Sequence, residues 1–155
     1  MDIDDVQVAC FRLGEDSYAA DIMRIKEITR LQKLTTLPKS PPFVEGVLNL
    51  RGTVIPVVDL RKRFGLAVAP YDRDTRLLIV RVGTQVLGLV VDEVTEVISV
   101  PVKDIKPPPQ VGRGIDAEYL VGVCLVKDSL IMLLNLDRVL SDRESEELNY
   151  LEGRN

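Results

Sequence analysis

The sequence predicts an all-β fold made of two similar halves. A segment that begins at Gly46 and ends at Phe64 recurs in diverged form from Gly122 to Leu140. Four positions are identical in the two copies, namely Gly46 and Gly122, Val47 and Val123, Ile55 and Ile131, and Leu60 and Leu136. Short apolar runs at regular spacing, closed by tight turns, favour β-barrels over a layered α/β sheet. Two similar halves would present two outer faces and one seam between them.

Each half is predicted to begin with a β-hairpin. The strand-like runs and their turns are 6–13, 14–16 and 17–22 in the first half, and 76–82, 83–85 and 86–91 in the second. Gly-rich polar turns between apolar runs are typical of hairpins. A short helical turn is expected next, because Ile22, Ile25 and Ile28 recur at helical spacing, and Asp92 could cap the equivalent turn in the second half.

A proline-rich connector and a second hairpin complete each half. The connectors span 37–42 and 101–109, and the hairpin turns fall at Arg51-Gly52 and Lys127-Asp128. Proline fixes φ and lacks an N–H, so the connectors should be ordered bridges. The polar stretch 70–75 is the best candidate for the link between halves.

Helices are expected to be short. Asp59 can cap a helical turn over Leu60–Phe64 that Gly65 would stop. Ser141 and Glu144 form a capping-box pattern for a C-terminal helix at about 141–152, which Leu148 and Leu151 would dock against the body.

Composition limits the partners and the compartment. A chain of 155 residues with 46% hydrophobic content can bury a core and should fold alone. The formal net charge of −4 argues against nucleic acid as a partner, because non-specific phosphate binding needs a concentrated positive field. The acidic N-terminus and the lack of an apolar run of roughly 20 residues predict a cytoplasmic protein without direct membrane insertion. Cys10 and Cys124 have no CxxC pairing, which favours buried, reduced thiols over a disulfide or a metal site.

The residues that usually carry catalysis are scarce. The chain has no histidine, the commonest general base, and it has neither a GxxxxGK[ST] loop nor a GxSxG elbow. Asp92, Glu93 and Glu96 cluster at a spacing that could serve a hard cation or acid/base chemistry, although a solvated, capped turn explains them as well. We therefore expect no enzymatic activity, no cofactor and no metal.

Arg51 is the strongest candidate for a binding residue. Its guanidinium could reach carboxylates in a bidentate manner while Gly52 relaxes the turn, although a solvated turn arginine is the alternative. Glu27 is the natural counter-charge if its segment packs beside the hairpin. Gly46 and Gly122 could provide flexibility at the start of a strand or permit the close approach of a partner.

The sequence around Arg51 gives the chain a family resemblance. The run VEGVLNLRGTVIPVVDLRKRFGL, preceded by LPKSPPF and followed by GLVVDEV, resembles the CheW adaptors of bacterial chemotaxis arrays. The resemblance covers about Val6 to Leu140. It implies one CheW-like domain with two SH3-like five-stranded β-barrels around a shared hydrophobic seam, and no enzymatic activity. We expect subdomain 1 at about 14–70 plus the chain ends, and subdomain 2 at about 71–140.

The resemblance also implies partners. Members of this family dock on the regulatory domain of the histidine kinase CheA and on the cytoplasmic tip of chemoreceptors, which would recruit the protein to membrane-associated arrays. Carried onto this sequence, Arg51 and Glu27 would couple receptor and kinase. Ile25 and Gly46 would lie near the kinase, and Val97 and Gly122 near the receptor. Weak self-association in arrays is a further expectation.

Three alternatives remain at this point. A free-standing barrel could bind a small ligand or an oligonucleotide, although the acidic charge and few aromatic residues oppose this. A hydrolase could use Asp92 or Glu96. Within the family, the same module occurs inside CheA or ahead of a receiver domain in CheV-like proteins. The chain shows no kinase or receiver segment, which favours the stand-alone adaptor.

Overall fold

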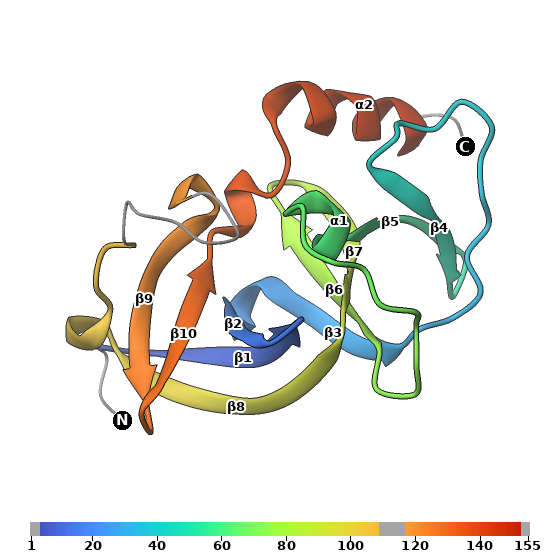
Figure 1. Ribbon diagram of the computed structural model, residues 1–155. Coiled ribbons are helices and arrows are strands. Elements are labelled where there is room, and N and C mark those ends of the chain that lie inside the picture. The colour runs from blue at the N-terminus through green and yellow to red at the C-terminus, as the bar shows by residue number, and fades with distance from the viewer. Residues whose placement is uncertain (1–3, 109–116, 153–155) are drawn as a thin grey trace.

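The computed structural model describes residues 4–108 and 117–152, and it is dominated by β-strands (Figure 1). The strands are β1 (Asp5–Leu13), β2 (Asp16–Asp21), β3 (Ile25–Arg30), β4 (Val44–Leu50), β5 (Thr53–Asp59), β6 (Arg76–Val82), β7 (Gln85–Val91), β8 (Glu93–Pro101), β9 (Leu120–Val126) and β10 (Ser129–Leu134). The α-helices are α1 (Leu60–Arg63) and α2 (Asp142–Glu152). Short 3-10 helices lie at Ile22–Arg24, Val102–Asp104, Ala117–Tyr119 and Leu136–Arg138.

The strands form two five-stranded sheets. Sheet A has the order β8-β1-β2-β10-β9, and sheet B has the order β3-β6-β7-β5-β4. The pairings β2/β10 and β5/β7 are parallel and the others are antiparallel. Each sheet curls on itself, because Thr35, after edge strand β3, pairs with Val47 on edge strand β4, and Lys106, after β8, pairs in the same way with Val123 on β9. The expected pair of SH3-like barrels is therefore present.

The two barrels do not follow the predicted division at about residue 70. Sheet B uses the continuous segment 25–91, whereas sheet A combines 5–21 with 93–134. The difference arises because the duplicated halves exchange strands: β3 pairs with β6 of the second half, and β8 pairs with β1 of the first. The stretch 70–75, expected to link the halves, lies within sheet B between α1 and β6.

The helical turns predicted after the first hairpins are mostly strands. Only Ile22–Arg24 is helical, with the Asp21 carboxylate accepting a hydrogen bond from the Met23 N–H. Burial alternates along β3, so that Ile25 is half-buried while Ile28 is exposed. A bulge in the pairing of β3 with β6 falls between Ile25 and Glu27. Of the three isoleucines, Ile22 thus lies in the 3-10 helix, whereas Ile25 and Ile28 lie in β3.

One hydrophobic cluster joins the two barrels. Phe11 and Tyr18 of sheet A meet Leu78 and Leu89 of sheet B in the same buried cluster, which we call the seam cluster. Smaller separate clusters lie within each barrel, and the one in sheet A holds both cysteines. Burying a large aliphatic side chain contributes about 1.5–3 kcal/mol. The seam cluster therefore holds the barrels together, as the sequence predicted.

The caps predicted for the two α-helices are present. The Asp59 carboxylate accepts a hydrogen bond from the Arg61 N–H at 2.9 Å and starts α1. Ser141 N donates to Glu144 Oε1 at 2.9 Å, and Glu144 N donates to Ser141 Oγ at 3.2 Å, which is a capping box. Leu148 is fully buried in the seam cluster. The side chain of Leu151 lies outside the described set.

The two cysteines are buried, as the sequence predicted. Cys10 and Cys124 are both buried and unpaired. Among the described helices, none has the length and apolar character needed to cross a membrane.

Candidate functional site

The structure brings Arg51 and Glu27 together as an ion pair. Arg51 lies at the turn between β4 and β5 with φ +53°, followed by Gly52 with φ +87°, so both turn residues are left-handed. Asn49 Oδ1 accepts a hydrogen bond from Gly52 N at 3.0 Å and holds the turn. From there Arg51 Nη2 donates to Glu27 Oε2 on β3. The pair thus connects edge strand β3 to the β4–β5 turn of sheet B.

This pair contributes little to folding. The side chain of Arg51 is 71% exposed and that of Glu27 is 31% exposed. Ion pairs in such solvent-exposed positions typically contribute about 0–1 kcal/mol to stability. The two charges therefore lie at the surface, and the fold makes little energetic demand on them.

The equivalent positions of sheet A differ. Lys127 has the same left-handed turn conformation, with φ +49°, and Glu96 is exposed on β8. Within the described residues, these two side chains form no ion pair. The two barrels therefore have the same backbone conformation at this turn, but only sheet B has an ion pair there.

Gly46 and Gly122 are buried rather than presented to a partner. A Cβ on Gly46 would lie 2.9 Å from Thr35 O, and a Cβ on Gly122 would lie 2.5 Å from Lys106 O. Both distances are shorter than real Cβ contacts, so each glycine lets the protein's own connector approach its barrel. Strand flexibility and approach of a partner were the two interpretations from sequence, and neither identified this contact.

Ile25 and Val97 have different environments. Ile25 on β3 is half-buried and packs against the seam cluster. Val97 on β8 is 52% exposed. Of the predicted site residues, Glu27, Ile25, Gly46 and Arg51 thus lie in sheet B, and Val97 and Gly122 lie on the edge strands of sheet A.

The hairpin of β4 and β5 is largely sandwiched within the fold. Ile55, Val57 and Val58 are buried, while Val54 remains exposed. Its apolar pattern is therefore explained mainly by burial on both faces of β5.

A buried charge network was missed by sequence reasoning. The Arg61 side chain is 1% exposed, and its Nε and Nη2 donate to the two Asp59 oxygens at 3.0 and 2.9 Å. Arg61 Nη1 donates to Asp92 Oδ1 at 2.9 Å and to Ala69 O at 2.7 Å. The hydrogen bond to Asp59 raises the pKa of Arg61 above its ordinary value, so this cation does not titrate. The Tyr71 ring covers the guanidinium at 5.2 Å.

The network joins the two barrels. Asp92 lies between β7 of sheet B and β8 of sheet A, and its Oδ2 accepts a hydrogen bond from Gly14 N at 2.7 Å, in the β1–β2 turn of sheet A. Asp92 was expected to cap a turn of its own segment, and it instead connects Arg61 to the other barrel. Both oxygens of its carboxylate accept hydrogen bonds, so Asp92 has a structural role between the barrels.

No group of acidic or sulfur ligands suited to a metal occurs in the part of the chain that the structure describes.

Comparisons with known proteins agree with the fold. Residues 7–144 match the family model of the CheW-like domain. The chain belongs to the CheW-like domain family. It is 38% identical to the chemotaxis protein CheW of Treponema pallidum, over 94% of this chain and 88% of that protein. It is 34% identical to the chemotaxis protein CheW of Klebsiella aerogenes, over 86% of this chain and 81% of that protein.

A solved structure has the same architecture. The crystal structure of the scaffolding protein TtCheW from Thermoanaerobacter tengcongensis superposes with a TM-score of 0.82 at 36% identity, covering 90% of each chain. The duplication, the seam and the two barrels are thus features of a CheW-like fold.

Proposed function

We propose that this protein is a non-enzymatic adaptor that couples chemoreceptors to the histidine kinase CheA in bacterial signalling arrays. The observation that carries the proposal is the exposed Arg51–Glu27 ion pair on a CheW-like fold. Several relatives are named chemotaxis protein CheW, and the solved relative is named a scaffolding protein. The partners would be the regulatory domain of CheA and the receptor tip. The adaptor would be cytoplasmic and reach the membrane only through the receptors.

Two barrels on one rigid body suit this role. Holding kinase and receptor on one body makes the second contact effectively intramolecular, so modest affinities can give a durable assembly. The seam cluster and the Arg61 network support this rigidity, because they fix one barrel against the other. Weak self-association would follow if the surface that meets CheA also accepts another copy of the fold.

The two barrels would divide the partners. We assign Ile25 and Gly46 to the kinase side and Val97 and Gly122 to the receptor side. The exposed apolar side chain of Val97 supports direct contact. The two buried glycines would act indirectly, because each sets how closely a connector packs on its barrel. Transmission requires that a receptor state favour one arrangement over another, typically by about 1–3 kcal/mol.

The experiment compares Arg51→Ala with Lys127→Ala, which removes the equivalent turn cation of sheet A. Each variant is assembled with CheA and receptor-containing membranes, and kinase activity is measured with and without attractant. We expect both variants to melt near the wild-type temperature, because both side chains are exposed. Arg51→Ala should lose receptor control of the kinase and Lys127→Ala should retain it. Equal receptor control in the two variants, or a large drop in the melting temperature of Arg51→Ala, would contradict the proposal.

A further inference from the structure

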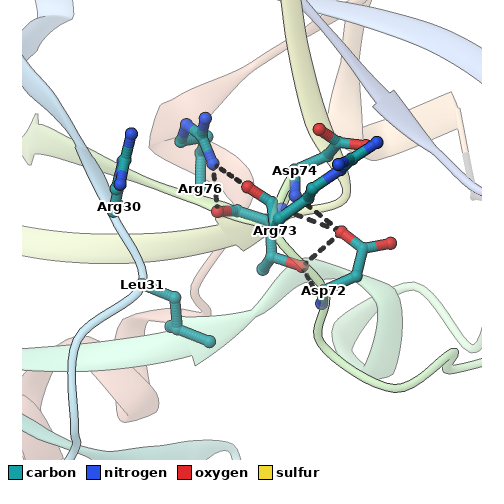
Figure 2. Close-up of a pocket in the computed structure, with 7 residues that line it drawn as sticks. Arg30, Leu31, Asp72, Arg73, Asp74 and Arg76 are labelled. Carbon is teal, nitrogen blue, oxygen red and sulfur yellow. Dashed lines mark hydrogen bonds between the residues drawn. The ribbon is translucent and has the colours of Figure 1, made fainter.

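A hollow bordered by arginines lies where β3 ends beside the start of β6. Its volume is about 480 Å³, and its lining residues are Arg30, Leu31, Asp72, Arg73, Asp74, Thr75 and Arg76. Figure 2 shows the side chains of Arg30 and Arg76 extending in the same direction from neighbouring segments. Three guanidinium groups and two carboxylates thus border one hollow, which carries a net positive charge in a chain whose formal net charge is −4.

Two of these arginines face each other directly. Arg30 and Arg76 are partners in the ladder between β3 and β6. Like charges opposite each other on neighbouring strands destabilise a sheet. Arg76 Nη1 donates to Arg73 O at 2.7 Å and to Thr75 O at 2.9 Å, which holds the side chain but supplies no negative charge. The arrangement is thus electrostatically unfavourable in the isolated protein.

The fold itself does not require arginine at these positions. The hairpin of sheet A repeats that of sheet B, and the ladder partners at the matching step between β1 and β8 are Gln7 and Ser99. The same backbone arrangement is therefore built with two neutral side chains in the other barrel. The paired arginines are a property of sheet B alone.

Two acidic residues, Asp72 and Asp74, also border the hollow, and they offset only part of the positive charge of the three arginines. Asp72 Oδ1 accepts hydrogen bonds from Asp74 N at 2.8 Å and from Thr75 N at 3.2 Å, and these bonds lower the pKa of Asp72 below its usual 3.8. The Asp72 carboxylate therefore stays ionised while it holds the loop, and Asp74 is the second carboxylate at the border of the hollow. Within residues 4–108 and 117–152, Arg30, Arg73 and Arg76 form no ion pair. The three guanidinium groups are therefore free to pair with an anionic group from outside.

We propose that the hollow binds an acidic segment of a partner protein, whose carboxylates sit between Arg30 and Arg76. Guanidinium groups bind carboxylates in a bidentate, charge-assisted manner, and a carboxylate between the two would convert their repulsion into attraction. The inference stands apart from the adaptor function, because it uses none of the residues assigned to kinase or receptor.

Two alternative roles for these arginines are protection against aggregation and binding of nucleic acid. Both agree less well with the structure than binding of an acidic segment does. Charges on an edge strand can simply oppose aggregation, but Arg76 lies on β6, an interior strand of sheet B. A nucleic acid would also offer anions, but a long polyanion would meet the net negative charge of the rest of the chain. A short acidic segment engages the hollow without that cost.

The test uses the full chain and a short fluorescein-labelled peptide rich in Asp and Glu. Fluorescence anisotropy is followed at low ionic strength for the wild type and for Arg30→Gln combined with Arg73→Gln. The matched control combines Arg138→Gln with Arg143→Gln, which removes the same charge at exposed positions outside the hollow. We expect saturable binding that is weakened about tenfold or more in the hollow variant and little changed in the control. Added salt should weaken binding further.

Several outcomes would overturn the inference. One is an equal loss of peptide affinity in the two double variants. Another is equal affinity for a control peptide in which Asn and Gln replace Asp and Glu. The third is tighter binding of a single-stranded oligonucleotide than of the acidic peptide. A separate measurement guards against misfolding. Arg30→Gln should leave the melting temperature unchanged or raise it, because it removes the repulsion with Arg76. A lowered melting temperature would assign Arg30 to the fold and contradict the proposal.

Discussion

Replacing Arg61 with alanine should strongly destabilise the protein, although the change removes a single charged side chain. Arg61 is 1% exposed and donates to Asp59, Asp92 and the Ala69 carbonyl. Without it, the buried carboxylate of Asp59 is left without a cation, and Asp92 keeps only the partly exposed Arg12, 3.8 Å away. Removing one partner of a buried ion pair typically costs about 3–5 kcal/mol, because the remaining charge is uncompensated.

The magnitude can be converted into a melting temperature. For a domain of this size, 1 kcal/mol corresponds to roughly 2–4 °C, so the expected decrease is on the order of 6–20 °C. Arg51→Ala is the matched comparison, since it removes the same side chain from an exposed ion pair and should shift the free energy of unfolding by about 1 kcal/mol or less. Thermal unfolding followed by circular dichroism and urea titration give both quantities.

The position of the network adds a second expectation. Asp92 and Gly14 connect Arg61 to sheet A, so loss of the arginine should also loosen the barrels relative to each other. Arg61→Lys should be intermediate, because an ammonium group cannot reproduce the bidentate bond to Asp59. Similar stabilities for Arg61→Ala and Arg51→Ala would refute the reasoning, since burial and connectivity would then have no effect.

Three further predictions follow from the same structure. Burial raises the carboxyl pKa of Glu144, but its hydrogen bond from Ser141 and its contacts with Arg63 outweigh this and lower it below 4.5. The stability that Glu144 contributes is therefore fully present above the carboxyl pKa of the unfolded chain, and it is lost as pH falls through the lower pKa of the folded protein. On acidification, the melting temperature of Glu144→Gln should therefore fall less than that of the wild type. Gly122→Ala should lower the free energy of unfolding by about 1–3 kcal/mol, because the new Cβ would overlap the connector backbone. Chemical denaturation of Gly122→Ala and Gly88→Ala tests this, and a smaller loss of stability in Gly122→Ala than in Gly88→Ala would contradict it. Burial raises the pKa of Cys10 to about 11, so a thiol reagent at pH 8 should modify it only after urea unfolding, and rapid modification of the native protein would show that the strand opens.

Local features of the fold were predictable from the sequence. The turn 14–16 between two apolar runs predicted the first hairpin, and Ser141 with Glu144 predicted the start of α2. The duplication predicted two alike barrels and a seam. Even the Arg51–Glu27 contact could be anticipated, because it needed only that one segment pack beside the other.

Features that depend on long-range partners were not predictable. Nothing local shows that β3 pairs with β6 rather than with its own hairpin, so the exchange of strands between the halves was missed. The three-residue spacing of isoleucines predicted a longer helical turn than the structure has, because Ile25 and Ile28 pair with β6 as part of β3. Arg61 sits in a run of exposed-looking basic residues, and only the folded chain brings Asp92 to it.

The most direct test of the adaptor account is a sedimentation assay with receptor-containing membranes. The isolated regulatory domain of CheA is added with increasing amounts of this protein, and the fraction of the domain in the pellet is measured. The account predicts that the domain sediments with receptor membranes only when this protein is present, and that the amount saturates as the protein is added. Equal sedimentation of the CheA domain with and without this protein would contradict the proposed coupling.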